Sequence, residues 1–547
     1  MGKLHQTQTT LACLSDGIRL ALLTPIIQEA LQTRCDFTQK LPMSWRWEVE
    51  WSLEEIDAMV YDWSRVLRHS SESLTSLACS FGNMLTGMLY VWPSYTLHHY
   101  ASKHTTILSS PMTDLETSLV GSLPSLGAMC GTAVIGTILS IFGRQKGGLI
   151  IVLPLMMSWL MIDLTTSSLV ILIARFIGGL SAGAFLVHCP IFVSEVAEES
   201  IRGTLASAPM TCYCLGTLVS YLLGWFLTHR YIIWANIASC LIYMALMITV
   251  TESPLFLMRQ NREEDARKAI SHYRGAYISS KIVLEEFSRL KQLITPAVEL
   301  RAVGSGETSK AEEAEKEKLN TENEDIEEKF KMSSFKMLYV SLSSRRAFTI
   351  VGLTLSFQVL MGMVAVQVYA KDIFAKAVPS LSSHMCSVMF AMVLLSGGIL
   401  STIFSDKFGR KILIVSSSVA VTLCLSGMGV LTQTSILPAW VTAVFILLYC
   451  LTFMFGAGSV PYILVTECFV PEVQSLASMI LMEWVWLLNF FIVGVFPFMI
   501  KYFGVHGSFY CFAFFGIANT IIGLFFVPET KGLTNEQIQE LFLRRRK

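Results

Sequence analysis

Charged residues are scarce in this chain. Only 15% of its 547 residues are Asp, Glu, Lys or Arg, whereas 53% are hydrophobic. A soluble domain is typically about a quarter charged. Lipid is therefore the expected solvent, and we expect the bilayer, and not nucleic acid, as the partner of most of the chain.

Motifs for catalysis and energy coupling are missing as well. There is no G-x-x-x-x-G-K-[ST] loop, no nucleophile beside a base and no cluster of metal ligands. Their absence argues against an enzyme, an ATP-driven pump and a bound cofactor or metal. The thirteen cysteines are scattered, and Cys212 and Cys214 form only a C-x-C pair, which is weak for zinc. We expect free thiols.

Long hydrophobic runs take up most of the chain. A bilayer core roughly 30 Å thick needs about 20 apolar residues per helix, and an open strand in hydrocarbon would leave backbone groups unpaired. The sequence thus predicts an all-α membrane protein. Its twelve expected transmembrane helices lie at residues 75–96, 118–142, 148–165, 168–193, 205–227, 231–251, 347–370, 384–405, 411–432, 437–463, 474–500 and 506–527.

A polar gap separates the first six spans from the last six. Residues 252–346 contain no spanning run, and the mixed charges at 307–331 are typical of solvated helix or disorder. We predict five parts, which are a tail at 1–74, a half at 75–251, a cytosolic loop at 252–346, a half at 347–527 and a tail at 528–547.

Basic residues in short loops predict the orientation. Arg144, Lys146, Arg345, Arg346 and the terminal "RRRK" fall on one side of the predicted bilayer. Because Lys and Arg accumulate in cytoplasmic loops, both termini should be cytosolic. The first tail lacks a signal-peptide cleavage pattern. Its residues 45–68 predict either an interfacial amphipathic helix or a segment packed under the bundle.

Two similar charged hinges follow the second and the eighth spans. They read "SIFGRQKGGL" (140–149) and "FSDKFGRKIL" (404–413). Equivalent loops in the two halves indicate parallel six-helix repeats, an architecture in which the substrate binds between the halves near midplane.

Further motifs occur in a fixed order along the chain. They are "ARFIGGLSAGAFLVHCPIFVSEVAEESIRGTLAS" (174–207), "TESPLFLM" (251–258) and "VPETKGLT" (527–534). Together with the hinges they resemble the sugar porter family of the major facilitator superfamily. The stretches "ETSLVGSLPSLGAM" (116–129), "RGTLASAP" (202–209) and "FAKAVPSLSS" (374–383) are similar to the insect facilitated trehalose transporters. The resemblance implies the major facilitator fold and transport by alternating access.

The resemblance also implies a charged latch at the cytosolic face. Its members here would be Arg144, Glu195 and Arg202 in the first half and Asp406, Arg410 and Glu467 in the second. Such pairs form in one state and release in the other. Ser140, Ile141 and Gln474 stand where the family has charges, which predicts a weakened latch and a bias toward the inward-open state.

Arg175 and the first span bear on coupling. Arg175 falls in the outer part of the fourth span, among glycines that allow close helix approach, and so needs defined partners. Proton-linked porters carry an acid on the first span, where this chain has Met84 or Leu85. We therefore predict passive uniport, with proton coupling through Glu483 as the alternative. His188 in the fourth span is expected to be structural.

The sugar site implied by the resemblance is only partly present. A sugar site requires amide and indole groups that bind hydroxyls. Gln358, Trp486 and Asn489 match the family. The positions that differ are Val359, Val364, Met210, Leu394 and Tyr462. Further polar or aromatic candidates are Glu483, Gln367, Tyr213 and Trp484. The cavity should be lined by helices 1, 4, 5, 7, 8, 10 and 11.

We predict a facilitative carrier of a sugar, trehalose or a hexose, acting as a monomer in the plasma membrane. Two alternatives stay open. The apolar replacements in the pocket suit a carrier of a less polar small molecule, and they equally suit a nutrient-sensing homologue that no longer transports.

Overall fold

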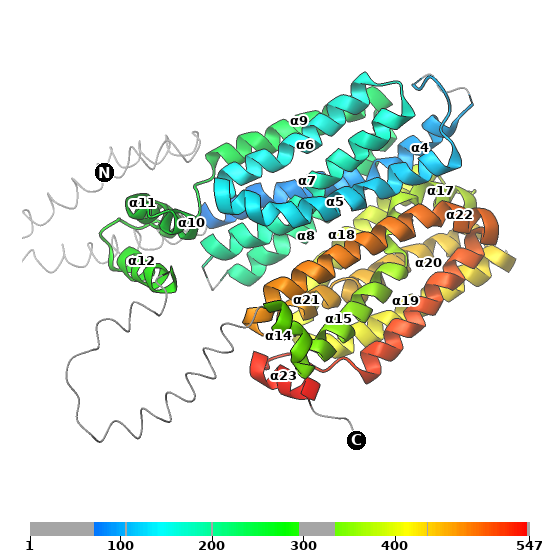
Figure 1. Ribbon diagram of the computed structural model, residues 1–547. Helices are drawn as coiled ribbons and strands as arrows, with labels where there is room; N and C mark the ends of the chain where they lie inside the picture. The colour runs from blue at the N-terminus through cyan, green and yellow to red at the C-terminus, as the bar shows by residue number, and fades with distance from the viewer. Residues whose placement is uncertain (1–70, 104–106, 199–200, 295–333, 435, 544–547) are drawn as a thin grey trace, which may run out of the picture.

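The protein forms two side-by-side helical bundles, drawn in blue to green and in yellow-green to red (Figure 1). The structure is a computed structural model that describes residues 71–103, 107–198, 201–294, 334–434 and 436–543. The sequence predictions for 45–68 and 307–331 fall outside these described residues.

The first bundle contains six long helices. They are the span Ser71–Ala101, whose outer part is α4 (Pro93–Ala101), followed by α5 (Asp114–Phe142), α6 (Arg144–Leu164), α7 (Ser168–Val196), α8 (Arg202–Phe226) and α9 (His229–Thr249). Three short helices follow, α10 (Pro254–Arg259), α11 (Glu263–Arg274) and α12 (Lys281–Ile294).

The second bundle is more broken. It comprises α14 (Ser334–Val340), α15 (Leu342–Leu360), α16 (Met363–Val368), α17 (Ala370–Ala377), α18 (Ser383–Phe408), α19 (Arg410–Thr434), α20 (Ala439–Thr452), the π-helix η2 (Phe453–Ala457), α21 (Val460–Glu467), α22 (Pro471–Phe525) and α23 (Asn535–Leu543).

The described residues account for twelve spans. Ten helical stretches are long and apolar enough to cross a membrane. One of them, Val473–Phe525, turns back at Gly504, where φ is 71°, and so supplies two spans (Figure 1). Adding α8, with 25 residues packed against α7, α9 and α18, completes the set. The predicted fold class is confirmed.

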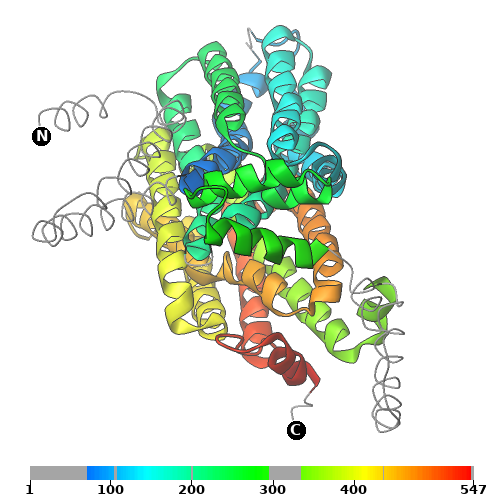
Figure 2. The same ribbon diagram turned by 90° about the vertical axis from the view of Figure 1, so that its left-hand side faces the viewer.

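The two ends of the bundle differ. We call the inner end the one that carries α10–α12 and the hinge glycines Gly143 and Gly409, and the outer end the opposite one, with Asp114 and Lys501. The names follow the predicted topology. Seen from the inner end, α11 and α12 lie across the helix ends of the first bundle (Figure 2).

Arg274 ties the α10–α12 module to the first bundle. The guanidinium of Arg274 donates to both carboxylate oxygens of Glu286, at 2.6 Å each. It also contacts the buried carboxylate of Glu72 at the start of the first span and donates to the carbonyl of Val196 at 3.1 Å. The module therefore belongs structurally to the first half.

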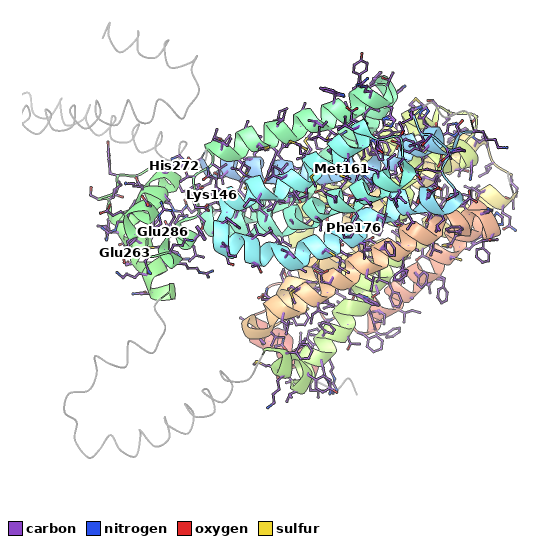
Figure 3. All side chains as sticks on the ribbon, turned by 45° about the horizontal axis from the view of Figure 1, so that its top comes forward. Lys146, Met161, Phe176, Glu263, His272 and Glu286 are labelled. Carbon is purple, nitrogen blue, oxygen red and sulfur yellow. The ribbon has the colours of Figure 1, made fainter. Side chains whose placement is uncertain are left out.

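Charged side chains gather on this module. Glu263, His272 and Glu286 project from it beyond the inner end of α6, where Lys146 lies, while Met161 is farther along α6 (Figure 3). The distribution fits an aqueous boundary at the inner end and an apolar one along the helices.

Prolines inside the spans leave backbone carbonyls without a hydrogen-bond donor, and side chains from neighbouring helices replace the donor. A proline has no N–H, so the carbonyl four residues before it loses its intrahelical donor, and in a bilayer another donor must replace it. Pro209 frees the carbonyl of Leu205 in this way, and the hydroxyl of Ser76 donates to that carbonyl at 3.4 Å. Such bonds tie adjacent spans together.

Candidate transport site

The inner end of the first half is held by a buried ion pair. Arg144 opens α6 and donates to both oxygens of Glu195 on α7, at 2.5 and 2.7 Å. The Ser253 hydroxyl donates to the same carboxylate at 2.5 Å. Glu252 accepts from the backbone N–H groups of Arg144, at 2.7 Å, and Gln145. A carboxylate at a helix N-terminus satisfies donors that have no intrahelical partner.

The second half repeats this arrangement with the same parts. Arg410 opens α19 and donates to Glu467 at 2.9 and 3.2 Å. The Thr530 hydroxyl donates to Glu467 at 2.5 Å. Glu529 accepts from the backbone N–H groups of Arg410, at 2.8 Å, and Lys411. The motifs at 251–258 and 527–534 thus supply a hydroxyl and a capping carboxylate each.

These contacts place the predicted latch residues only in part. Both predicted pairs are formed, but each lies within one half and does not join the halves. The side chains of Arg202 and Asp406 lie outside the described part of the chain. Gln474, where the family has a charge, donates to the carbonyl of Thr466 at 2.9 Å. Sequence reasoning missed Glu252 and Glu529, although their motifs were visible.

Arg175 has defined partners, as its glycine-rich surroundings predict. It is fully buried, and its guanidinium donates to the carbonyls of Leu89, at 2.9 Å, and Val120, at 3.0 Å. These are the two carbonyls that Pro93 and Pro124 deprive of their intrahelical donors. Arg175 therefore joins two proline-interrupted helices, while its Nη2 has no hydrogen-bond partner among the described residues.

Two further predictions concern His188 and the cysteines Cys212 and Cys214. The Nε2 atom of His188 lies 2.8 Å from the carbonyl of Arg144, fully inside the protein, which suits the expected structural role. Cys212 and Cys214 are free thiols, and no group of three or more metal-ligating side chains occurs among the described residues.

At the outer end, contacts join the two halves. The Nζ of Lys501 lies 2.5 Å from Oδ2 of Asp114. The backbone N–H of Lys371 on α17 donates to the hydroxyl of Ser94 at 3.1 Å. Burial lowers the pKa of Lys371 and raises the pKa of the adjacent Asp372. Charged groups are therefore held inside this closed outer surface.

Tyr369 reinforces that closure. Its hydroxyl donates at 3.3 Å to the carbonyl of Val493, which Pro497 deprives of its donor. The same hydroxyl lies so close to Gly121 of the other half that a Cβ there would stand 2.7 Å away. The outer halves of the two bundles are thus in direct contact.

The seventh span is interrupted where two glutamines lie. α15 ends and α16 begins on either side of Gly362, where φ is 82°. Gln358 precedes the break and Gln367 follows it. Gln367 meets the other half, because its side-chain oxygen accepts from Tyr213 at 3.4 Å and its carbonyl from Tyr221 at 2.6 Å.

Trp486 also spans the two halves. Its ring stacks on Tyr90 with centroids 6.2 Å apart and planes 8° from parallel, and its Nε1–H donates to Thr132 at 3.0 Å. Asn489 lies one turn farther along α22. The neighbouring Trp484 instead donates to Ser356 of its own half, at 2.8 Å.

Three buried amides near this interface have unused polar atoms. Among the described residues, nothing bonds to Oε1 of Gln358, Nε2 of Gln367 or Oδ1 of Asn489. Buried polar atoms normally have partners, so each of these groups calls for a water or a ligand. Both carboxyl oxygens of Glu483 are unpartnered in the same way.

The apolar replacements divide into two groups. Val359 and Leu394 are buried in the core, so their side chains pack against protein. Val364 is half-buried, whereas Met210 and Tyr462 are exposed. The assignment of these five positions to the pocket stays a prediction.

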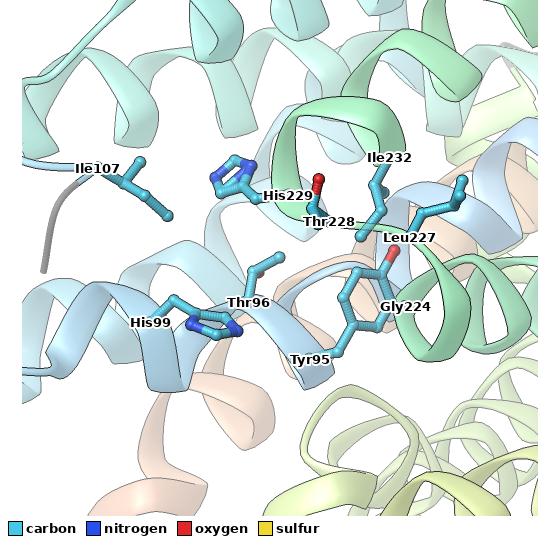
Figure 4. A pocket seen from close by; sticks show the side chains of 9 residues that line it. All are labelled: Tyr95, Thr96, His99, Ile107, Gly224, Leu227, Thr228, His229 and Ile232. Atoms are coloured by element: carbon cyan, nitrogen blue, oxygen red, sulfur yellow. The ribbon is translucent and has the colours of Figure 1, made fainter.

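A pocket of about 290 Å³ lies at the outer end within the first half, and none of the predicted site residues lines it (Figure 4). Tyr95, Thr96, His99 and His229 give it polar walls. His229 is held by the hydroxyl of Tyr100 at 2.6 Å.

The profile of the family "Sugar (and other) transporter" matches residues 72–542. The chain belongs to this sugar transporter family. It is 26% identical over 487 residues to the facilitated trehalose transporter Tret1 of Polypedilum vanderplanki, covering 87% of this chain and 88% of the relative. For Tret1 of Drosophila virilis the identity is 26% over 492 residues, covering 89% of this chain but about half of the relative, 49%.

Solved sugar transporters share the fold. The inward-open, partially occluded xylose transporter XylE of E. coli superimposes with a TM-score of 0.66 at 20% identity, over 85% of this chain and 100% of that one. XylE bound to 6-bromo-6-deoxy-D-glucose gives 0.65 at 20% identity, over 87% of this chain and 100% of that one. This member of the sugar transporter family is a multi-pass membrane protein and not an enzyme.

Proposed function

We propose that this sugar transporter moves an uncharged sugar, trehalose or a hexose, down its concentration gradient by alternating access. Membership of the sugar transporter family supports the sugar, and the relatives named for facilitated trehalose transport favour the passive mode and the disaccharide.

The observation that carries the proposal is the set of unsatisfied amides. Gln358, Gln367 and Asn489 are buried, come from the seventh and eleventh spans and each keep one polar atom unused. Hydroxyl groups both donate and accept, so a sugar can satisfy an amide oxygen and an amide nitrogen alike. Trp486, three residues before Asn489 on α22, adds an aromatic face.

The passive mode is supported by the first span. It has no carboxylate opposite Arg175, of which Nε and Nη1 donate instead to two backbone carbonyls. The first span therefore lacks the acidic residue that proton-linked porters carry there. The charge of Arg175 has a structural use that does not require a proton cycle.

The remaining parts of the proposal concern the cellular setting. Basic residues at the inner hinges favour a cytosolic inner end, and hence cytosolic termini. We assign the protein to the plasma membrane as a monomer, with each half supplying its own latch.

Purified protein in liposomes tests the function. Uptake of trehalose or of glucose should saturate, with the pentose xylose tested for comparison. Gln367→Ala and Asn489→Ala should each weaken this uptake roughly tenfold, since one buried hydrogen bond is worth about 1–3 kcal/mol. Gln260→Ala, which removes an exposed amide, is the matched control. Absence of saturable sugar uptake by folded protein would refute the proposal.

A carrier of a less polar molecule is the second candidate. Val359, Leu394 and Val364 stand where the family has amides, and the first two pack in the core. If this candidate is right, the same liposomes should take up a less hydroxylated metabolite and ignore the three sugars. Uptake of neither class would favour a sensor.

A further inference from the structure

Glu483 is the charged residue that the proposed sugar site leaves unexplained. It is the thirteenth residue of α22, roughly 18 Å along the helix from Pro471 at 1.5 Å per residue. Its neighbour Trp484 bonds to α15, and Trp486, nearly one turn away, bonds to Thr132 of the other half. Glu483 therefore lies deep in the bundle, beside a contact between the halves.

Glu483 as a whole is half-buried, but its two carboxyl oxygens are enclosed and have no hydrogen-bond partner among the described residues. Both oxygens have almost no accessible surface and accept no hydrogen bond from any described residue. An ionisable group at membrane depth is costly and marks a functional site by default.

The helices packed against α22 place their charges elsewhere. Their titratable and charged residues are Asp114, Glu116 and Cys130 on α5, Lys336 and Tyr339 on α14, Arg345 and Arg346 on α15, Lys371, Asp372 and Lys376 on α17, Arg410, Lys411 and Cys424 on α19, and Tyr462 and Glu467 on α21, with none on α16. The first span, whose Tyr90 stacks on Trp486, adds Glu72, Cys79, Tyr90, Tyr95, His98, His99 and Tyr100, and it carries no Lys or Arg. α22 itself carries Glu472, Lys501, Tyr502, His506, Tyr510 and Cys511.

No cation in this set reaches Glu483. On α15, Arg346 lies ten residues (356 − 346) before the partner of Trp484, roughly 15 Å along the axis. An ionised carboxylate without a cation or a donor is strongly unfavourable in such surroundings. The described surroundings therefore favour the neutral, protonated form of the carboxyl group.

We propose that Glu483 is a proton-binding site and that passive transport requires it to be protonated. The ligand is a proton, because the sealed oxygens leave no room for a metal ion or an ammonium group, and no group of three metal-ligating side chains exists among the described residues. The step is an O–H bond made with a proton from water and broken again, with no redox change.

The consequence for transport follows from position. An ionised Glu483 would draw water between α22 and α5, next to the Trp486–Thr132 bond and the Trp486–Tyr90 stack. The closed outer arrangement would then lose its contacts at midplane. Transport should slow as pH rises, although protons supply no driving force.

Equilibrium exchange of labelled sugar tests this, with the same pH on both sides of the liposome. This inference rests on the proposed sugar transport. Between about pH 5 and about pH 9, exchange by the native protein should fall at least tenfold, whereas Glu483→Gln should exchange at a constant rate. Glu285→Gln, on the exposed surface of α12, is the control and should follow the native protein. A flat native profile, or an unchanged profile in Glu483→Gln, would overturn the proposal.

A second measurement does not depend on transport. The infrared pH-difference spectrum should contain the C=O stretch of a buried carboxylic acid, which disappears in Glu483→Gln and in Glu483→Met. Its persistence in both variants would overturn the proton site. Sugar-driven acidification of the liposome lumen that Glu483→Gln abolishes would keep the site and refute passive transport, so the two failures are distinguishable.

Discussion

The inner and outer ends of the bundle are held by different kinds of contact. At the inner end, the pairs Arg144–Glu195 and Arg410–Glu467 each stay within one half. At the outer end, Lys501 meets Asp114 across the halves. The two inner pairs therefore stabilise one half each, whereas the outer pair is a contact between the halves.

The inner end also differs between its two copies. The side chains of Arg144 and Glu195 are 7% and 9% exposed, whereas those of Arg410 and Glu467 are 14% and 26% exposed. Breaking a buried pair costs more than breaking an exposed one, because an unpaired charge stays behind in low dielectric. The same motif should thus matter more in the first half.

Removing the first arginine gives the largest expected effect. Arg144→Ala leaves Glu195 buried without its cation and should lower the free energy of unfolding by about 3–4 kcal/mol, while Arg410→Ala should cost about 1–2 kcal/mol. Thermal unfolding in detergent measures both. Equal losses in the two variants would contradict the difference in burial.

Replacing Arg175 should give the next largest effect, because this residue joins two helices in the outer part of the first half. Arg175→Ala leaves two carbonyls without donors and should cost about 2–3 kcal/mol of stability, with a larger loss of transport. Arg175→Lys should recover little, since one ammonium cannot replace the two separated donors.

The proline explanation of Arg175 has its own control. Adding Pro93→Ala and Pro124→Ala to Arg175→Ala restores backbone N–H donors for Leu89 and Val120, so stability should return in part. A further loss in the triple variant would show that Arg175 acts otherwise. Surface expression and uptake, measured together, separate folding from transport.

The hinge glycines should respond alike in both halves. Gly143 and Gly409 have φ of 89° and 85°, a region that alanine avoids, and a Cβ would stand 2.5 and 2.7 Å from the capping carboxylates Glu252 and Glu529. Alanine at either position should cost about 1–3 kcal/mol. Unequal unfolding temperatures would show that the two caps are not equivalent.

The exposed pair at the outer end gives the smallest effect. Lys501→Gln should change the unfolding free energy by less than about 1 kcal/mol, because Lys501 and Asp114 are both largely exposed. A matching effect of high salt on the native protein would support this, and a large loss of stability would refute it.

Some residues at the inner end could be predicted from sequence motifs, and others could not. Arg144 and Glu195 could be named in advance as latch residues, because the resemblance to the family implied them, and the structure pairs them. Glu252 and Glu529 could not be given roles, because their contacts are to backbone N–H groups. The inward-open bias expected from Ser140, Ile141 and Gln474 stays a prediction.

The pocket was less predictable than the latch. Gln358, Gln367, Trp486 and Asn489 could be named from position, yet their unused atoms depend on neighbours from distant spans. Leu394 is buried in the core, and its place at the pocket stays a prediction. A helix carries side chains on every side, and only packing decides which side meets the cavity.

By itself, the sequence determined the solvent, the spans and the repeated halves. The length of a hydrophobic segment and the charge of a loop are local properties, and they decide how the segment inserts into the bilayer. Tertiary structure alone decided the partners of Arg175 and the isolation of Glu483. A proline in the sequence identifies a backbone carbonyl that lacks its intrahelical donor, but the packing of neighbouring helices decides which side chain replaces that donor. The sequence shows that Glu483 carries an ionisable carboxyl group, but only its surroundings decide whether that group is protonated.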